Sequence, residues 1–323
     1  MYKFVLITVL ALSAILVYTG CKEEVNTEFD NLTSTIIEGL TIYNYPKVDG
    51  STSTEPLNAI IACKLFGIAY KWILTEDGTK HVEPNLNKND SSKFTKLFKS
   101  SQTHQSFINL IDKEAELILT ARKLSPDEKA YADTAGVSLI ETPIALDAFV
   151  FIINPYNPIQ SLTIKQVQDI YTGKTTNWNE LGGDDIEIVP FVRNTNSGSQ
   201  ELMETLVMKD LDITEFPVND FELIFSMAGS LDMVSQHINS ICYTVYYYKE
   251  HIGTVSGSVK SVAINGIYPD RNTISDRSYP YVAEVYAVIR SDLDEASMAY
   301  KLYEWLQTEA GKQVIIESKY LPN

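Results

Sequence analysis

Short apolar runs typical of β-strands alternate with amphipathic, helix-like runs along most of this sequence, and this alternation is its most constraining feature. Strands that alternate with helices build sheets covered by helices, so the pattern predicts an α/β fold. No linker rich in Pro or Gly divides the chain, which favours domains joined by strands, with crossings expected at 143–149 and 282–289. The expected strands are 115–121, 145–154, 186–193, 240–248, 261–267 and 281–290, and the expected helices are 57–70, 106–113, 164–171, 199–207 and 293–310.

Size and charge narrow the functional classes. The chain has 323 residues, which corresponds to about two domains of roughly 100–200 residues each. Its 45% of apolar residues can form a packed core. Against 26 Lys and Arg stand 42 Asp and Glu, giving a net charge of −16. This balance disfavours nucleic-acid binding, because phosphate backbones attract clustered Lys and Arg.

Histidines and cysteines are sparse. The four His and three Cys have spacings that match no zinc pattern, so we expect no metal site and no cofactor. Cys63 and Cys242 lie in apolar surroundings. They are either two buried free thiols or, in an oxidising compartment, a disulfide.

The N-terminus has the pattern of an export signal. A basic start is followed by an apolar run at 4–17, which is shorter than the roughly 20 residues of a spanning helix. Residues 1–20 are therefore predicted to be a signal peptide. Small residues and Cys21 follow the apolar run and resemble a lipobox, although Tyr18 stands where Leu is usual. We interpret Cys21 as the lipid attachment site and 21–35 as a tether on a bacterial membrane; the alternative is an ordinary signal peptide with an incidental cysteine.

A hydroxyl-rich loop at 49–57 precedes an expected helix. Gly50 permits a tight turn, hydroxyls follow from Ser51 to Thr54, and Pro56 suits a first helical turn. Such a loop presents O–H and N–H donors to an anion at the positive end of the helix dipole. The alternative is a cluster of helix caps without a ligand.

Two further segments have similar donor chemistry. In 191–201 an expected strand ends at Arg193, whose planar fork suits two oxygens of an oxyanion, and Ser197, Gly198 and Ser199 open the next helix. The expected strand 115–121 leads to Thr120 and Arg122, at the kind of strand end where open α/β sheets bind ligands. Repeated donor-rich helix starts in one chain favour an anion ligand over simple capping.

Longer motifs connect these loops to a known family. The segments 49–57 and 193–199, together with LTIKQVQDIYTGKTTNWNELGG at 162–183, resemble the phosphate-binding lipoproteins of phosphate ABC transporters. PIALDAFVFIINPYNP at 143–158 is similar to the crossover strand of that family, and 264–289 to its late segment. The resemblance extends over roughly 40–321, and its motifs are long and in the family's order.

The resemblance implies a set of phosphate contacts. The family's first anion loop falls on Thr52 and Ser53, its strand-end stretch on 120–122, and its Arg-(x)₃-Ser-Gly loop on 193–199. The loop 99–106 lacks the family's glycines, so Thr103, His104 and Ser106 are only possible contacts. The implied phosphate-binding residues are Ser51, Thr52, Ser53, Thr54, Thr120, Arg122, Arg193, Ser197, Gly198 and Ser199.

One position departs from the family. Phosphate at neutral pH carries a proton, so a site that prefers it to sulfate benefits from an acceptor, commonly an Asp two residues after the Arg. That position is Thr195 here. Asp49 and Asp147 are the candidates to supply the carboxylate instead.

The resemblance also implies an architecture and a function. Members have the two-lobed type II periplasmic-binding-protein fold, with two mixed sheets flanked by helices and a ligand cleft between the lobes. Lobe 1 would comprise 36–144 and 285–323, and lobe 2 would comprise 145–284. The implied protein is a monomeric, extracytoplasmic lipoprotein that captures inorganic phosphate for the permease subunits of an ABC importer, closing by hinge motion.

Two other functions stay open. One is a binding protein or sensor for a different oxyanion or small acid, which the absent Asp and the divergent loop 99–106 leave possible. The other is a secreted phosphatase, which we disfavour because the sequence has no nucleophile elbow and no His-Glu-x-x-His motif.

Overall fold

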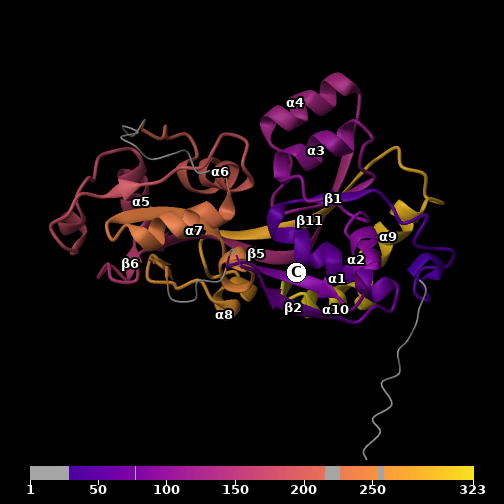
Figure 1. Ribbon diagram of the computed structural model, residues 1–323. Helices are drawn as coiled ribbons and strands as arrows, with labels where there is room; N and C mark the ends of the chain where they lie inside the picture. Colours follow the sequence, from indigo (N-terminus) through magenta and orange to yellow (C-terminus); the bar gives the residue numbers. More distant parts are fainter. Residues whose placement is uncertain (1–28, 77, 215–225, 254–257) are drawn as a thin grey trace, which may run out of the picture.

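A computed structural model of the protein describes residues 29–76, 78–214, 226–253 and 258–323. The predicted signal peptide and Cys21 lie outside these residues. Two bodies lie side by side, and strands β5 (Leu139–Ile153) and β11 (Val282–Arg290) run between them (Figure 1). The mixed α/β architecture predicted from the sequence is confirmed.

Strand β5 is the spine of the central sheet. Its 15 residues pair with β11 along 139–148 and with β8 along 149–153, so two parts of the sheet share this one strand. Every residue from Ile144 to Ile153 is buried, as expected for a strand with both faces covered. The strand order is β1-β4-β11-β5-β8-β7, with β9 and β12 also paired to β5. The remaining strands are β1 (Val48–Gly50), β4 (Leu117–Thr120), β7 (Val189–Pro190), β8 (Ser240–Val245), β9 (Lys260–Ser261) and β12 (Leu321–Pro322).

The sheet is mixed in both parts. Strands β1 and β4 are parallel, and so are β7 and β8, whereas β11 is antiparallel to β4 and to β5. Parallel neighbours at the edges place strand ends and the helix starts that follow them on the same side. This arrangement brings the donor loops toward one another.

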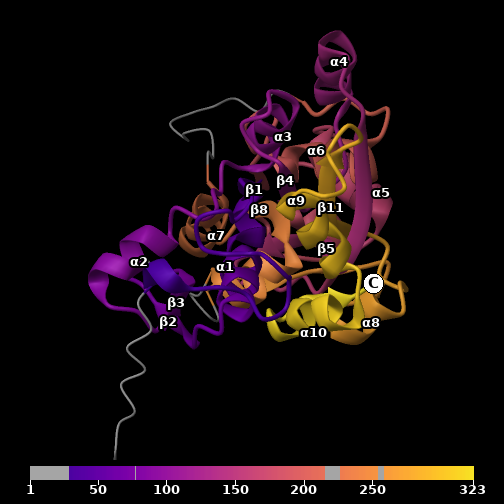
Figure 2. The same cartoon turned by 90° about the vertical axis from the view of Figure 1, so that its right-hand side faces the viewer.

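Helices cover the sheet on both bodies. Helix α9 packs on β11 and β4, and α10 packs on β5 (Figure 2). The body that contains both termini of the described chain carries α1 (Glu55–Leu65), α2 (Lys88–Phe94), α3 (Thr103–Ile111), α4 (Pro126–Ala135), α9 (Met298–Leu306), α10 (Glu309–Glu317) and the hairpin β2 (Tyr70–Leu74) with β3 (Lys80–Pro84). The other carries α5 (Ile164–Tyr171), α6 (Gly198–Leu202), α7 (Met227–Gln236), β6 (Ser161–Leu162) and β10 (Ala263–Ile264), and α8 (Arg271–Ser275) lies beside β5 and β12. The described chain also has three short 3-10 helices, η1 (Phe29–Asn31), η2 (Thr52–Thr54) and η3 (Trp178–Leu181), and two π-helices, η4 (Met203–Met208) and η5 (Tyr248–Ile252).

Several expected elements have different bounds. The helix expected at 57–70 ends at Leu65, because Gly67 at φ +67° closes it and the chain turns into β2. The helix expected at 293–310 is two helices, since Thr308 caps a new start and a side chain at Gly311 would lie 2.2 Å from the Trp305 carbonyl oxygen. The strand expected at 186–193 is only the two residues of β7, and the expected strand 261–267 is divided between β9 and β10.

Two further observations concern the cysteines and the character of the helices. Cys63 and Cys242 are both buried free thiols, which decides between the two alternatives for this pair. In the described part of the chain, no helix combines the length and apolar character needed to cross a membrane.

Candidate functional site

A cavity of about 280 Å³ lies between the two bodies, and the starts of helices converge on it. Turn η2 leads into α1 from one body beside the start of α3, and α6 and α7 start from the other. Helix starts carry unsatisfied N–H groups and a positive dipole end, so this convergence favours an anion. The donor-bearing part of the lining, which we call the oxyanion half, consists of Ser51, Thr52, Ser53, Thr103, Arg193, Ser197, Gly198 and Ser199.

The first donor loop is held against β4. A Cβ at Gly50 would lie 2.5 Å from the carbonyl oxygen of Leu119, so only glycine allows this approach. The Thr54 hydroxyl donates to the carbonyl oxygens of Ser51 at 2.9 Å and Leu119 at 2.8 Å. Thr54 therefore fixes the loop and does not line the cavity, whereas its neighbour Ser53 does.

Ser51 links two helix starts. Its Oγ accepts from the backbone N–H of Ala121 at 3.1 Å and shares a hydrogen bond of 2.8 Å with Oγ1 of Thr103. Thr103 opens α3, and its side chain lies against Gly198 of the opposite body, where an added Cβ would be 2.5 Å from Oγ1 of Thr103. The structure thus places Thr103, one of the possible contacts, in the oxyanion half.

The second body contributes a buried cation. Arg193 is 5% exposed, and burial lowers the pKa of its guanidinium below the usual value. Its backbone N–H donates to the Tyr243 hydroxyl at 3.0 Å and to Oε1 of Gln200 at 3.3 Å, which orients the turn. Ser197 caps α6 by accepting from the backbone N–H of Gln200 at 3.1 Å. A desolvated arginine in a cavity wall gains from an anionic ligand that restores its polar surroundings.

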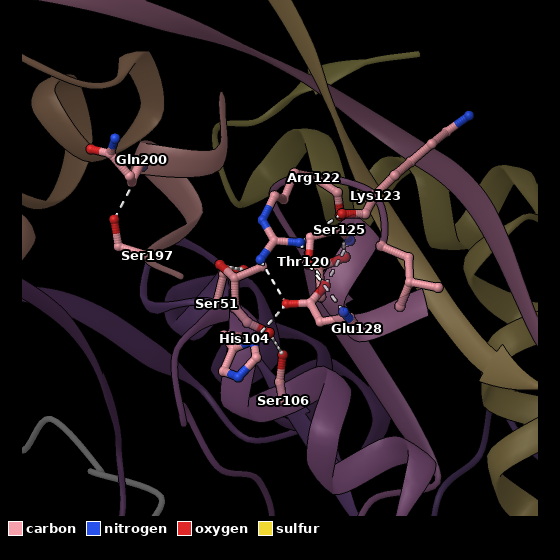
Figure 3. A network of polar contacts seen from close by, with 12 residues as sticks. Ser51, His104, Ser106, Thr120, Arg122, Lys123, Ser125, Glu128, Ser197 and Gln200 are labelled. Atoms are coloured by element: carbon pink, nitrogen blue, oxygen red, sulfur yellow. Dashed lines mark hydrogen bonds and ion pairs between the residues drawn. The ribbon is translucent and has the colours of Figure 1, made fainter. Parts of the chain in front are cut away.

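Arg122 is differently placed. Its guanidinium forms two hydrogen bonds of 2.8 Å with the carboxylate of Glu128, and His104 reaches the same carboxylate at 3.0 Å (Figure 3). Burial alone would raise the pKa of Glu128, but Arg122 outweighs that effect and holds the pKa below its usual value. Arg122 and Thr120 are both outside the cavity lining among the described residues; the Thr120 hydroxyl donates to the Arg122 carbonyl oxygen at 2.9 Å.

The Arg122 side chain nevertheless keeps one donor open. Its Nε is buried and has no hydrogen-bond partner among the described residues. Figure 3 shows this side chain above Ser51, between Glu128 and Ser197 of the opposite body. Arg122 therefore stands next to the oxyanion half, with most of its hydrogen-bonding capacity used by Glu128.

Neither candidate acceptor reaches the cavity. Asp49 accepts from the backbone N–H groups of Gly50 at 2.7 Å and Ser101 at 2.9 Å and from the Asn109 side chain at 2.6 Å. Asp147 accepts from two backbone N–H groups through Oδ1, its Oδ2 has no partner in the described chain, and burial raises its pKa to about 7. The remaining possible contacts, Thr195, His104 and Ser106, are not among the lining residues.

The sequence did not point to another part of the cavity lining. Glu55, Thr79, Lys80 and His81 line it there, with Ile252 from the opposite body. We call these five residues the hairpin half, because most belong to the β2–β3 hairpin or its turn. The Asp-Gly pair at 77–78 is a hairpin signal that could have located β2 and β3, although not their place at the cavity.

Metal ligation has no support in this geometry. Within the residues that the structure describes, no group of three His, Cys, Asp or Glu side chains is arranged to hold a metal ion.

Comparisons with known proteins agree with the fold. A family model described as the PBP superfamily domain matches residues 47–309. The phosphate-binding protein PstS of Borreliella burgdorferi is 22% identical over 258 residues, which is 77% of this chain and 89% of that protein. A second relative, PstS of Bacillus subtilis, is 23% identical over 186 residues, which is 57% of this chain and 58% of that protein.

Solved structures give the same architecture. A protein described as a phosphate ABC transporter substrate-binding protein from Clostridium perfringens, solved with bound phosphate, has a TM-score of 0.63 at 24% identity. That match covers 86% of this chain and 99% of the other. An ABC-type phosphate transport receptor from Vibrio cholerae has a TM-score of 0.60 at 20% identity, covering 86% and 100% of the two chains.

Proposed function

This chain belongs to the PBP superfamily, and from that premise we propose that it captures inorganic phosphate in its interlobe cavity. Relatives that carry the name phosphate-binding protein PstS support the ligand. The observation that carries the proposal is the oxyanion half, where hydroxyls, helix starts and one buried arginine surround a cavity between two bodies.

Each body would supply part of the ligand shell. Ser51, Thr52 and Ser53 would donate from the first loop, with Thr103 beside them. Arg193, Ser197 and Ser199 would donate from the opposite body, and Gly198 would let the backbone approach. Donors of this kind form charge-assisted hydrogen bonds, which are stronger than neutral ones. The net charge of −16 does not oppose them, because bulk charge is screened over about 8 Å at physiological salt.

Arg122, Thr120 and Thr54 have a supporting role in this proposal. Arg122 would reach the ligand only through Nε, while Glu128 holds the rest of its fork. Thr54 and Thr120 brace the loops through backbone carbonyls. We do not assign the ligand's proton to Asp49 or Asp147, since both carboxylates are used inside the protein.

The cellular setting is part of the same proposal. The protein would be exported by residues 1–20, anchored through lipidated Cys21 and tethered by 21–35. Its lobes, 36–144 with 285–323 and 145–284, would close about β5 and β11 and hand phosphate to the permease subunits of an ABC importer as a monomer. No reaction on the ligand is required, so the protein would not be an enzyme.

Calorimetric titration of residues 22–323 with phosphate and then with sulfate, at pH values on either side of 7, tests the ligand. We expect phosphate to bind. Arg193→Ala should lose most of the affinity, whereas Thr195→Ala, on an exposed position outside the cavity, should retain it. Normal phosphate affinity in Arg193→Ala would remove that residue from the site.

Other outcomes would redirect the proposal. Equal binding of sulfate, or silence toward phosphate, would keep the fold and assign the cavity to another oxyanion or small acid. Release of phosphate from a model ester by the purified protein would revive the phosphatase alternative.

A further inference from the structure

We propose that the cleft also accepts a small phosphate monoester, with its phosphate in the oxyanion half and a hydroxyl-bearing organic group in the hairpin half. This inference rests on the proposed function, because it assigns the remaining part of the same cavity. Three features carry it: the size of the cavity, the different contacts that join its two halves across the cleft, and the chemistry of the hairpin half.

The cavity is larger than inorganic phosphate requires. Its volume of about 280 Å³ corresponds to roughly nine water-sized groups at ~30 Å³ each. Inorganic phosphate has only five non-hydrogen atoms. After it has bound, space for several more atoms would remain next to it.

Different contacts join the two halves of the cavity across the cleft. The oxyanion half is joined across the cleft by the packing of Thr103 on Gly198. The hairpin half is joined across the cleft elsewhere, by an antiparallel bridge between Thr79 and Gly253. Glu55 and His81 also line a second cavity, together with Val82 and Pro84 of the hairpin.

The hairpin half suits a polar organic group. His81 lies between Glu55, whose Oε1 is 3.4 Å from its Nδ1, and Thr79, whose hydroxyl is 2.9 Å from its Nε2. A carboxylate accepts hydrogen bonds from alcohol hydroxyls, and Lys80 donates to their oxygens. Apolar walls from Pro56 and Ile252 cover carbon atoms. Glu55 would repel a second anionic group, so the fitting substituent is a neutral one with hydroxyls.

The protonation states of the two ligands favour the ester over inorganic phosphate in the oxyanion half. A phosphate monoester has its second pKa near 6, so above neutral pH its phosphate carries no proton. Inorganic phosphate keeps one P–OH group there and needs an acceptor for it. The oxyanion half consists of hydroxyls, backbone and Arg193, and the carboxylate in the described lining of the cavity, that of Glu55, already lies 3.4 Å from Nδ1 of His81. A proton-free phosphate matches these donors, and its fourth oxygen carries the organic group toward Glu55.

The test is calorimetric titration of residues 22–323 at pH 7.5 with inorganic phosphate, glycerol 3-phosphate and sulfate. We expect glycerol 3-phosphate to bind at least tenfold more tightly than inorganic phosphate. Tighter binding of the ester supports the inference. Phosphate binding with weaker binding of the ester overturns it and leaves the proposed function intact, whereas silence toward both overturns both.

A variant pair locates the organic group. Lys80→Met should lower the ratio of ester affinity to phosphate affinity at least fivefold. Lys71→Met is the matched control, because Lys71 is an exposed residue of β2 that is not among the cavity-lining residues and pairs with Glu83 at 2.8 Å. An unchanged ratio in Lys80→Met, or an equal fall in both variants, would exclude the hairpin half as the ester site.

Discussion

The contact between Gly198 and Thr103 gives the most direct test of how the two bodies meet at the cavity. In Gly198→Ala the new Cβ would lie 2.5 Å from Oγ1 and 3.2 Å from Cβ of Thr103, whereas ordinary contact begins at 3.4 Å. Thr103 cannot easily move away, because it is buried, β-branched and bound to Ser51 at 2.8 Å. The two bodies would have to separate by roughly 1 Å at this point.

The cost can be stated in terms of affinity. Overpacking of this kind costs about 1–3 kcal/mol, and about 1.4 kcal/mol corresponds to a tenfold change in binding. Because the clash exists only where the bodies meet, the open protein should keep its stability. Gly198→Ala should therefore weaken phosphate binding about 5- to 150-fold and leave the thermal midpoint of the unliganded protein close to that of the parent.

Calorimetry and thermal unfolding measure the two quantities. The double variant Gly198→Ala with Thr103→Ala is the control, since it removes the hydroxyl nearest to the new methyl group. A double-mutant cycle should show that Thr103→Ala costs less in the alanine background than in the parent. Phosphate affinity within twofold of the parent in Gly198→Ala would refute the reasoning.

Three other predictions concern stability. Glu128→Gln should lower the free energy of unfolding by about 3–5 kcal/mol at pH 7, because it leaves Arg122 as a buried unpaired charge. Since Arg122 lowers the pKa of Glu128, the greater stability of the parent is present above about pH 4.3 and is lost as the pH falls through the lowered pKa. Denaturant titrations across this pH range measure the difference. Asp147→Asn should raise the free energy of unfolding by roughly 4 kcal/mol at pH 8, because burial raises the pKa of Asp147 from about 3.9 in the unfolded chain to about 7. The parent loses this stability as the pH rises between the two values, so the variant should match the parent near pH 4 in the same titrations. Gly50→Ala should lower the thermal midpoint, because its Cβ would lie 2.5 Å from the Leu119 carbonyl oxygen; an unchanged midpoint would contradict the clash.

The fold class and most of the long strands could be predicted from the sequence. Long apolar runs such as 281–290 became strands, because a run buried on both faces has one stable environment in an α/β fold. Element ends were less accessible. The apolar spacing of the helix expected at 57–70 continued through Gly67, but the left-handed conformation of that glycine ends the helix and the chain turns into β2.

The two arginines show what a local pattern can and cannot predict. Arg193 and Arg122 both lie at the end of an expected strand, and both were predicted to bind phosphate. Arg193 lines the cavity, whereas Arg122 is held by Glu128, which caps its own helix and turns back toward the strand end. That pairing is local, because the capping box of Ser125 and Glu128 at the start of α4 places the carboxylate six residues after Arg122.

The acidic candidates failed to reach the cavity for the same kind of reason. The partners of Asp49 and Asp147 include Asn109 and the backbone of Tyr247, which are distant along the chain. Whether a carboxylate points into a cavity or into the protein is set by such partners. The hairpin half was missed because its residues have no motif and acquire their position only when β3 packs on η5.

Buried carboxylates can support an anion site without touching the anion. Asp49 accepts from the backbone N–H groups of Gly50 and Ser101, and so ties together the two loops that precede η2 and α3. Glu128 holds the Arg122 fork beside Ser51 in the same way. Each carboxylate accepts hydrogen bonds from donors inside the protein. The helix starts that these bonds hold in place keep their own donors directed at the cavity. An acidic protein can therefore present donors to an anion, because buried acids behind the loops are engaged in orienting those donors.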